Sequence, residues 1–261
     1  MNVKTFFTST AVIFSLATSA VLAAPHWTHE EQNEWGAISD DTQTIAPLMY
    51  PYAECSIGQH QSPVDLAGES NAKQLNTLQT QYVTDKSDFY NSGHAVQVNT
   101  SVGYKGQLKI GNDLYPLIQY HFHAPSEHVI GKKTFPAELH FVHIREDGRM
   151  AVVGVLLQKG AANATIQTIL DNVSPNAAEH NPDTGIEINP NTLLPHNASF
   201  FYTYAGSLTT PPCSEGVSWY VLAKPVTVSD AQLSQLKALY SDNTRLPQNL
   251  NGRVVTGKIN K

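Results

Sequence analysis

Five of the eleven histidines lie in one short stretch, from residue 121 to residue 143, within two segments that read as β-strands. In a strand, alternate side chains share a face, so His121 and His123 project together, about 7 Å apart along the backbone. The same alternation places His140 on the face of Glu138 and His143 on the opposite face. If the two segments pair antiparallel, His140 completes a set of three imidazoles that leaves a fourth tetrahedral position open to water. This pattern predicts a catalytic zinc site.

The competing interpretation is that these histidines are buried and hydrogen-bonded. It is favoured for any one of them alone, but not for the three together. His143, by its face, and His128, beside Glu127, are interpreted as structural. A metal-binding imidazole needs an outer partner that fixes its orientation, and Gln119 and Glu138 each lie two residues before a candidate ligand on the same face. Both are predicted to hold their histidines, with a more distant or surface carboxylate as the alternative for Glu138.

The segments that would position these side chains are rich in Val, Ile, Tyr, Phe and Thr and are separated by Gly, Pro, Asn and Asp, as expected of a sheet protein. The clearest predicted strands span 95–98, 107–110, 117–122, 137–144 and 151–157. Helices are predicted at 230–240, where Ser229 and Gln232 form a capping-box signature, and around 166–173. Residues 176–197 are polar and contain proline, which predicts a loop.

The formal net charge of −6 disfavours nucleic acid as a partner. An apolar run from Ala11 to Ala24 follows Lys4 and ends in small residues, so residues 1–24 are predicted to be a signal peptide, cleaved after Ala23 or Ala24. A retained anchor is the alternative, but the run is shorter than the roughly 20 residues that a membrane span needs. No later segment is apolar enough to span. Residues 25–261 are predicted to form one domain, periplasmic or secreted.

Two cysteines in an exported chain are most simply interpreted as one disulfide, between Cys55 and Cys213. In the chain-entropy view, a crosslink that encloses so long a loop stabilises the fold by up to about 5 kcal/mol. Two free thiols are the alternative.

Seven motifs follow one another along the chain. They are Gln61-Ser62-Pro63, Asn91-Ser92-Gly93-His94, His121-Phe122-His123, Ser126-Glu127-His128, Glu138-Leu139-His140-Phe141-Val142-His143, Gly206-Ser207-Leu208-Thr209-Thr210-Pro211-Pro212-Cys213 and Asn251-Gly252-Arg253. Together, over nearly the whole mature chain, they resemble the α-class carbonic anhydrases. The compact Ala124-Pro125-Ser126 turn is similar to the bacterial secreted branch of that family.

The resemblance implies a mainly β, single-domain protein built on a large central, mixed and mostly antiparallel twisted sheet of about ten strands, with a few short peripheral helices. It implies one Zn²⁺ per chain, bound by His121, His123 and His140. The implied reaction is reversible hydration of carbon dioxide to bicarbonate and a proton, by attack of zinc-bound hydroxide. Glu127 and Thr209 are implied to orient that hydroxide, because a hydroxyl that donates to the carboxylate must accept from the hydroxide.

The same resemblance assigns the proton shuttle to His94, whose ordinary pKa near 6.5 suits proton transfer. Thr210 and Gln97 are implied to order the intervening waters, and Thr209 and Thr210 to contact substrate. An apolar substrate pocket is implied, for which ordinary core packing is the alternative role; its residues are Val142, Val152, Leu208, Val217 and Trp219.

Two departures from the family's pattern concern proton transfer. His29 stands where the family has a tyrosine, and Ser92 stands where asparagine is common; His29 is hypothesised to be an auxiliary relay. The disulfide is predicted to hold the Thr209 segment in register. A homodimer is implied by bacterial members alone. The competing functions are a catalytically silent binding relative and a three-histidine hydrolase that acts on esters, and weak esterase activity is expected of any zinc hydroxide in an open cleft.

Overall fold

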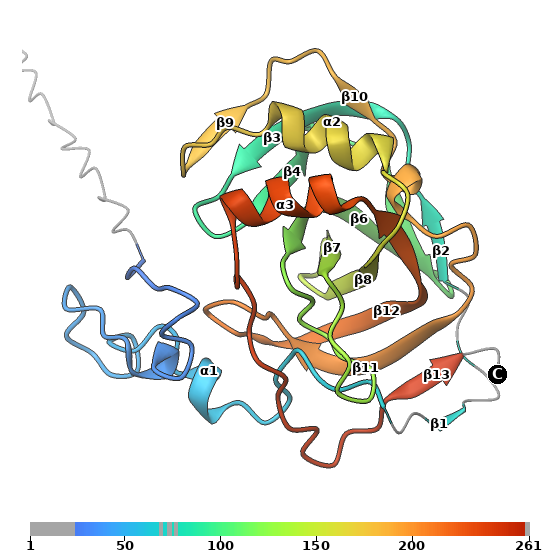
Figure 1. The fold of residues 1–261 in the computed structure, drawn as a ribbon. Coiled ribbons are helices and arrows are strands. Elements are labelled where there is room, and N and C mark those ends of the chain that lie inside the picture. The colour runs from blue at the N-terminus through green and yellow to red at the C-terminus, as the bar shows by residue number, and fades with distance from the viewer. Residues whose placement is uncertain (1–23, 68–69, 72–74, 76–77, 259–261) are drawn as a thin grey trace, which may run out of the picture.

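The computed structural model describes residues 24–67, 70–71, 75 and 78–258, which fold around one large twisted sheet (Figure 1). Its thirteen strands are β1 (Ser70–Asn71), β2 (Leu78–Gln81), β3 (Asp85–Asn91), β4 (Val96–Thr100), β5 (Gln107–Ile110), β6 (Asp113–His123), β7 (Ala137–Ile144), β8 (Met150–Lys159), β9 (Glu179–Asn181), β10 (Glu187–Ile188), β11 (Phe201–Ser207), β12 (Glu215–Val228) and β13 (Thr256–Lys258).

Neighbouring strands follow the order β1-β13-β11-β12-β8-β7-β6-β4-β3-β10, while β5 pairs with β2 and β6, and β9 pairs with β3. The β8–β12 and β1–β13 pairs are parallel. The other pairs are antiparallel. The mixed, mostly antiparallel sheet implied by the sequence is therefore confirmed.

Strands β6, β7 and β8 occupy the middle of the sheet. β7 and β8 are buried over nearly their whole lengths because both of their faces are covered by other parts of the chain. The five strands predicted from the sequence correspond to β4 through β8 and are confirmed. In the β6–β7 pair, His121 lies directly opposite His140. This register is what brings the histidine segments together.

Two helices lie side by side over one face of the sheet (Figure 1). The helical segments are α1 (Glu54–Ile57), α2 (Ala164–Asn172), α3 (Asp230–Leu239) and two 3₁₀ turns, η1 (Trp35–Ala37) and η2 (Pro190–Leu193). Apolar residues of α2 and α3 pack with Phe141 and its neighbours in the larger hydrophobic cluster. The predicted capping box is present, since Ser229 and Gln232 each bond the backbone of the other. Both predicted helices are confirmed.

The prediction of a loop over residues 176–197 is wrong in part. This segment contains β9 and β10, which pair with β3, and then the 3₁₀ turn η2. The two strands are only three and two residues long and are held by hydrogen bonds to β3. Because this pairing depends on a distant partner strand, and not on a hydrophobic pattern of its own, the sequence does not indicate it.

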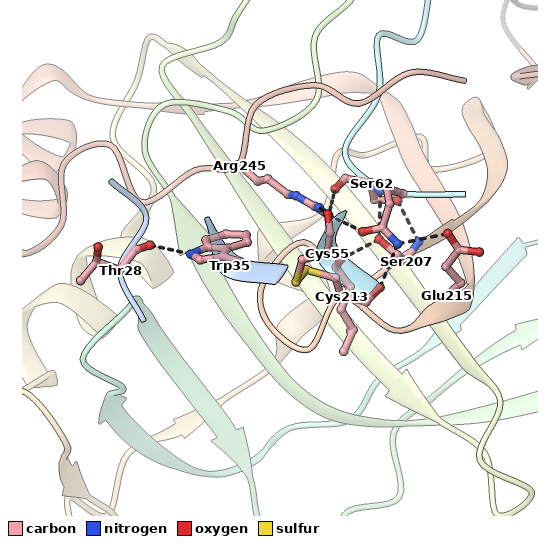
Figure 2. The surroundings of a disulfide bond; sticks show 10 residues. Thr28, Trp35, Cys55, Ser62, Ser207, Cys213, Glu215 and Arg245 are labelled. Carbon is pink, nitrogen blue, oxygen red and sulfur yellow. Dashed lines mark hydrogen bonds between the residues drawn. A yellow bond between two sulfur atoms is a disulfide. The ribbon is translucent and has the colours of Figure 1, made fainter. Parts of the chain in front are cut away.

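The predicted disulfide is confirmed: Cys55 in α1 is bonded to Cys213, 158 residues away, in the segment between β11 and β12 (Figure 2). Residues 1–23 lie outside the described residues, so the signal peptide and its cleavage stay predictions. Within the part of the chain that the structure describes, no helix is long and apolar enough to cross a bilayer.

Candidate metal centre

The three histidines predicted to bind a metal meet on one face of the β6–β7 pair. β6 contributes His121 and His123, and β7 contributes His140. Their candidate ligand nitrogens all lie within 4.8 Å of one another, and their ring centroids are 4.7 to 5.3 Å apart. His123 and His140 are buried, and His121 is partly exposed. The three imidazoles are thus close enough to share one ion.

Each of these rings has one nitrogen held by an acceptor outside the set. Nδ1 of His121 donates to Oε1 of Gln119 over 2.8 Å, and Nδ1 of His123 donates to the backbone carbonyl of Asn243 over 2.6 Å. Nε2 of His140 donates to Oε1 of Glu138 over 3.0 Å. A proton fixed on that nitrogen leaves the other nitrogen of the ring with a lone pair. The atoms available to a cation are therefore Nε2 of His121, Nε2 of His123 and Nδ1 of His140.

The surroundings of these nitrogens fit a divalent metal ion. Nε2 of His123 is buried and has no hydrogen-bond partner among the described residues, which is costly for a polar atom unless a ligand completes it. Burial lowers the pKa of all three imidazoles, which keeps them neutral as metal ligands must be. Three neutral imidazoles are a donor set that suits Zn²⁺.

His128, Glu138 and His140 form a second group of potential ligands, but hydrogen bonds within the protein already satisfy it. The Glu138 carboxylate accepts from Nδ1 of His128 over 2.7 Å, from His140, and from the backbone amides of Glu127 and His128. Burial alone would raise the pKa of Glu138, yet His128 and His140 hold it well below its ordinary value. Glu138 is fully buried, which excludes the surface-carboxylate alternative.

Glu127 and Thr209 are both buried, and the Thr209 side chain interacts with the Glu127 carboxylate. Oε1 of Glu127 accepts from the Arg245 amide over 2.9 Å. Its other oxygen, Oε2, is 3.7 Å from Nε2 of His123 and 3.9 Å from Nδ1 of His140, and no described residue donates to it. Burial raises the pKa of Glu127 to about 7, although His140, the Arg245 amide and the Thr209 side chain act against this shift. A cation bound by the three histidines would lower the pKa of Glu127 from this value.

A cavity of about 210 Å³ reaches His121 and His123 and is also lined by His94, Gln97 and Thr210. The His94 ring is half-buried and stacks on an indole, that of Trp27, with centroids 3.8 Å apart. Burial lowers the pKa of His94, and a nearby imidazole, that of His26, lowers it further. The structure thus brings His94 to the same cavity as two of the candidate ligands.

The two departures from the family's pattern, His29 and Ser92, line this cavity too. Burial lowers the pKa of His29 to about 3, with contributions from His123 and His94. An imidazole with so low a pKa takes up a proton poorly near neutral pH, which argues against the relay hypothesis. The Ser92 hydroxyl accepts from the amides of His94 and Ala95 and so fixes the turn that carries the predicted shuttle.

The five residues predicted to line an apolar pocket gather in one hydrophobic cluster beside the metal centre. Val142, Val152, Val217 and Trp219 are buried, and Leu208 packs against them partly exposed. The ring centroid of Trp219 is 4.9 Å from that of His140. None of the five lines the 210 Å³ cavity. Their main role among the described residues is therefore to pack the hydrophobic core.

Sequence analysis did not predict Asn243 and Arg245, which contact His123 and Glu127. Both contacts are made by backbone atoms, 120 and 118 residues away from their partners along the chain. A backbone carbonyl or amide leaves no residue-type pattern. The polar run that follows α3 would indicate only a loop, so no signal in this sequence could have found them.

Comparison with known proteins agrees with this geometry. Residues 47–259 match the family model described as eukaryotic-type carbonic anhydrase. The carbonic anhydrase of Pectobacterium carotovorum is 36% identical over 252 residues, which cover 95% of this chain and 97% of the relative. That of Neisseria gonorrhoeae is 38% identical over 252 residues, covering 94% and 95%.

A solved structure is similar to this chain in fold as well as in sequence. The α-carbonic anhydrase of Thermovibrio ammonificans, in complex with the inhibitor sulfanilamide, has a TM-score of 0.81 and 34% identity, covering 90% of this chain and 100% of that one. Sequence relatives and structural neighbour therefore agree along almost the full length of the chain. This protein belongs to the eukaryotic-type, or α-class, carbonic anhydrase family.

Proposed function

We propose that this protein is an enzyme that reversibly hydrates carbon dioxide to bicarbonate and a proton, with one Zn²⁺ per chain bound by His121, His123 and His140. Membership of the family supports the reaction. The observation that carries the proposal is that each imidazole has one nitrogen held by an acceptor while the other lies within 4.8 Å of its counterparts. Bound Zn²⁺ would lower the pKa of water from 15.7 to about 7 and so supply a nucleophile at neutral pH.

Thr209 and Glu127 orient the attacking oxygen. A threonine hydroxyl has one proton, so when it donates to an ionised carboxylate its lone pairs accept a hydrogen bond from the nucleophile. That bond turns a remaining lone pair of the nucleophile toward the carbon of the substrate. The position of Oε2 of Glu127, beside Nε2 of His123, supports this role, because a nearby cation keeps the carboxyl ionised.

His94 takes up the proton that the reaction releases and passes it to solvent. Its place on the wall of the same cavity as His121 supports this role, since waters there can join the two. Thr210 and Gln97, on the same wall, order those waters. The lowered pKa of His94 favours release of the proton to solvent.

The uncharged substrate lies against the apolar cluster beside the metal centre, with Thr209 and Thr210 in contact with it. The cluster is made of Val142, Val152, Leu208, Val217 and Trp219, and the packing of Trp219 against His140 supports this placement. The enzyme acts in the periplasm or outside the cell. The Cys55–Cys213 disulfide supports this location, because disulfides are typical of oxidising compartments.

Stopped-flow hydration of carbon dioxide, measured beside ester hydrolysis before and after chelation, tests this function. We expect fast hydration that chelation abolishes and Zn²⁺ restores, with ester hydrolysis far slower. A zinc-loaded protein with no hydration activity would instead identify a silent binding relative. Hydrolysis of an ester faster than hydration would identify an ester hydrolase.

A further inference from the structure

A short segment after α3, residues 243–245, holds two members of the metal centre through its backbone. The Asn243 carbonyl accepts from Nδ1 of His123 over 2.6 Å, and the Arg245 amide donates to Oε1 of Glu127 over 2.9 Å. The Asn243 side chain fixes the segment to the end of β6, where it accepts from the Ala124 amide over 2.9 Å. Any shift of this segment would therefore move a candidate ligand and the buried carboxylate together.

The Arg245 side chain ties the segment to a distant part of the chain (Figure 2). Although it carries a guanidinium, Arg245 is only 3% exposed. Nη1 donates to the side-chain carbonyl of Gln61 over 2.7 Å and to the Ser62 carbonyl over 3.0 Å, and Nη2 donates to the Cys55 carbonyl over 2.9 Å. A planar guanidinium with five fixed donors can make these three bonds at once, whereas a lysine ammonium cannot reproduce their geometry.

The disulfide connects the far ends of this network. Cys55, whose carbonyl accepts from Arg245, is bonded to Cys213. The Cys213 carbonyl in turn accepts from Nε2 of Gln61 over 3.1 Å, and Oε1 of the same glutamine accepts from Arg245. Cys213 follows Thr209 by four residues. The Thr209 segment and the 243–245 segment are thus joined through one arginine, one glutamine and one disulfide.

We propose that Arg245 is a positioning residue that transmits the constraint of the Cys55–Cys213 disulfide to His123 and Glu127. This inference rests on the proposed zinc site and adds a determinant of how firmly that site holds its metal. Arg245 touches neither metal nor substrate; it acts through the 243–245 segment. Loss of the guanidinium, or of the disulfide, loosens the same two backbone contacts and lets Zn²⁺ leave faster.

The rate of zinc release into excess chelator, compared between Arg245→Lys and the matched control Arg253→Lys, tests the proposal. Loss of an outer partner of a ligand weakens metal binding by about 10–100-fold, so we expect Arg245→Lys to release zinc about 10-fold faster. We also expect it to alter the visible absorption of the cobalt(II)-substituted protein, which reports ligand geometry and which a loss of global stability alone would not change.

The control removes a guanidinium of similar bonding. Arg253 donates to four backbone carbonyls, none of them in the metal centre: those of Leu250, Ala205, Gln61 and Asn249. It shares Gln61 with Arg245 but bonds only the backbone of that glutamine, whereas Arg245 bonds the side chain that reaches Cys213. Arg253→Lys should lower the unfolding temperature and leave both the zinc release rate and the cobalt spectrum as in the wild type.

The link to the disulfide is tested by a Cys55→Ala, Cys213→Ala variant, alone and combined with Arg245→Lys. Because both changes act through the same contacts, the combined variant should release zinc little faster than either alone. If the disulfide-free chain does not fold, a phosphine reductant added to the already folded, zinc-loaded protein gives the same comparison, with far-UV circular dichroism to confirm that the fold persists during the measurement. Reduction should then accelerate release from the wild type but not from Arg245→Lys.

A wild-type release rate in folded Arg245→Lys would overturn the proposal. Rate increases that multiply in the combined variant would overturn the link to the disulfide. Failure of the proposed function gives a different result, because the wild-type protein itself would then bind no zinc, or would bind it without hydrating carbon dioxide.

Discussion

At the scale of single residues, the site depends on which nitrogen of each imidazole carries the proton. Strand alternation was enough to predict that Gln119 and Glu138 share faces with His121 and His140, and the structure places both within hydrogen-bond distance. The partner of His123 is a backbone carbonyl, that of Asn243, which no residue pattern could reveal. The sequence thus predicts two of the three outer partners, because side chains that share a strand face follow a residue pattern. It cannot predict the third, because every residue has a backbone carbonyl.

The proposed shuttle is tested by His94→Ala. In the proposed mechanism, hydration itself does not need this imidazole but regeneration of the nucleophile does, so kcat should fall by about 10²-fold while kcat/KM stays near the wild-type value. Small imidazole buffers should restore kcat. Stopped-flow measurements at varied buffer concentration provide the check, with His196→Ala as control because His196 is exposed and does not line the cavity that holds His94. An equal fall of kcat and kcat/KM would contradict the shuttle.

At the scale of elements, β8 must leave room for the carboxylate that holds His140. Gly154 lies opposite His140 in the β7–β8 pair, and a Cβ there would come within 2.9 Å of Oε1 of Glu138. Gly154→Ala should displace the carboxylate and weaken zinc affinity by about 10-fold, measured by competition with a chelator. Gly160→Ala is the control, because a Cβ there would also make a close contact, 2.8 Å from the Thr227 side chain, but would meet no residue of the metal centre. Equal zinc affinity in the two variants would show that β8 does not constrain the site.

The other face of β7 makes the fold sensitive to acid. Burial lowers the pKa of His143 to about 4. Nδ1 of this imidazole donates to the Ala151 carbonyl, and Nε2 accepts from the Tyr82 hydroxyl. Below about pH 6.5 the His143 imidazole takes up a proton in the unfolded chain, whereas in the folded chain it does so only below about pH 4. Stability should therefore fall as the pH decreases through this window, by up to about 3 kcal/mol.

Urea unfolding of the wild type and of a Tyr82→Phe, His143→Phe variant, at several pH values between 7 and 4.5, measures this contribution. The variant removes both polar partners and should lose less stability over the same interval. An identical pH dependence in the two proteins would mean that His143 is not the group responsible.

Which elements could be predicted follows from where their stabilisation comes from. β6, β7 and β8 carry their own hydrophobic pattern and were predicted, as was α3 from its capping box. β9 and β10 exist only because β3 offers hydrogen bonds to them, and they were missed. Local pattern thus predicts the core elements and fails for segments whose structure a distant partner imposes.

At the scale of the whole molecule, one covalent bond joins segments 158 residues apart. Reduction should lower the free energy of unfolding by up to about 5 kcal/mol, because the unfolded chain regains the freedom that the closed loop denies it. Hydration activity should fall before or together with global unfolding, since Cys213 lies near Thr209 in the chain. Denaturant unfolding and activity, followed with and without reductant, give the comparison. Full activity in a folded Cys55→Ala, Cys213→Ala variant would count against this.

The organisation of the whole chain was predicted in its class and in its covalent bond, but not in its internal connections. Composition predicts a sheet protein, and two cysteines in a chain that is itself predicted to be exported predict the bridge. The contacts of Arg245, which join the N-terminal region to the end of the chain, depend on tertiary structure alone. Long-range backbone contacts of this kind are the part of the site that the sequence could not reveal.

The measurement that tests the central claim most directly is a titration of metal-free protein with Zn²⁺, with the hydration rate of carbon dioxide recorded at each addition. Because three imidazoles converge on one point, we predict that the rate rises linearly and reaches its plateau at one equivalent of metal per chain. His123→Ala should abolish this titration at the same metal concentrations. Rapid hydration by the metal-free protein, or a fully zinc-loaded protein that does not hydrate carbon dioxide, would contradict the account.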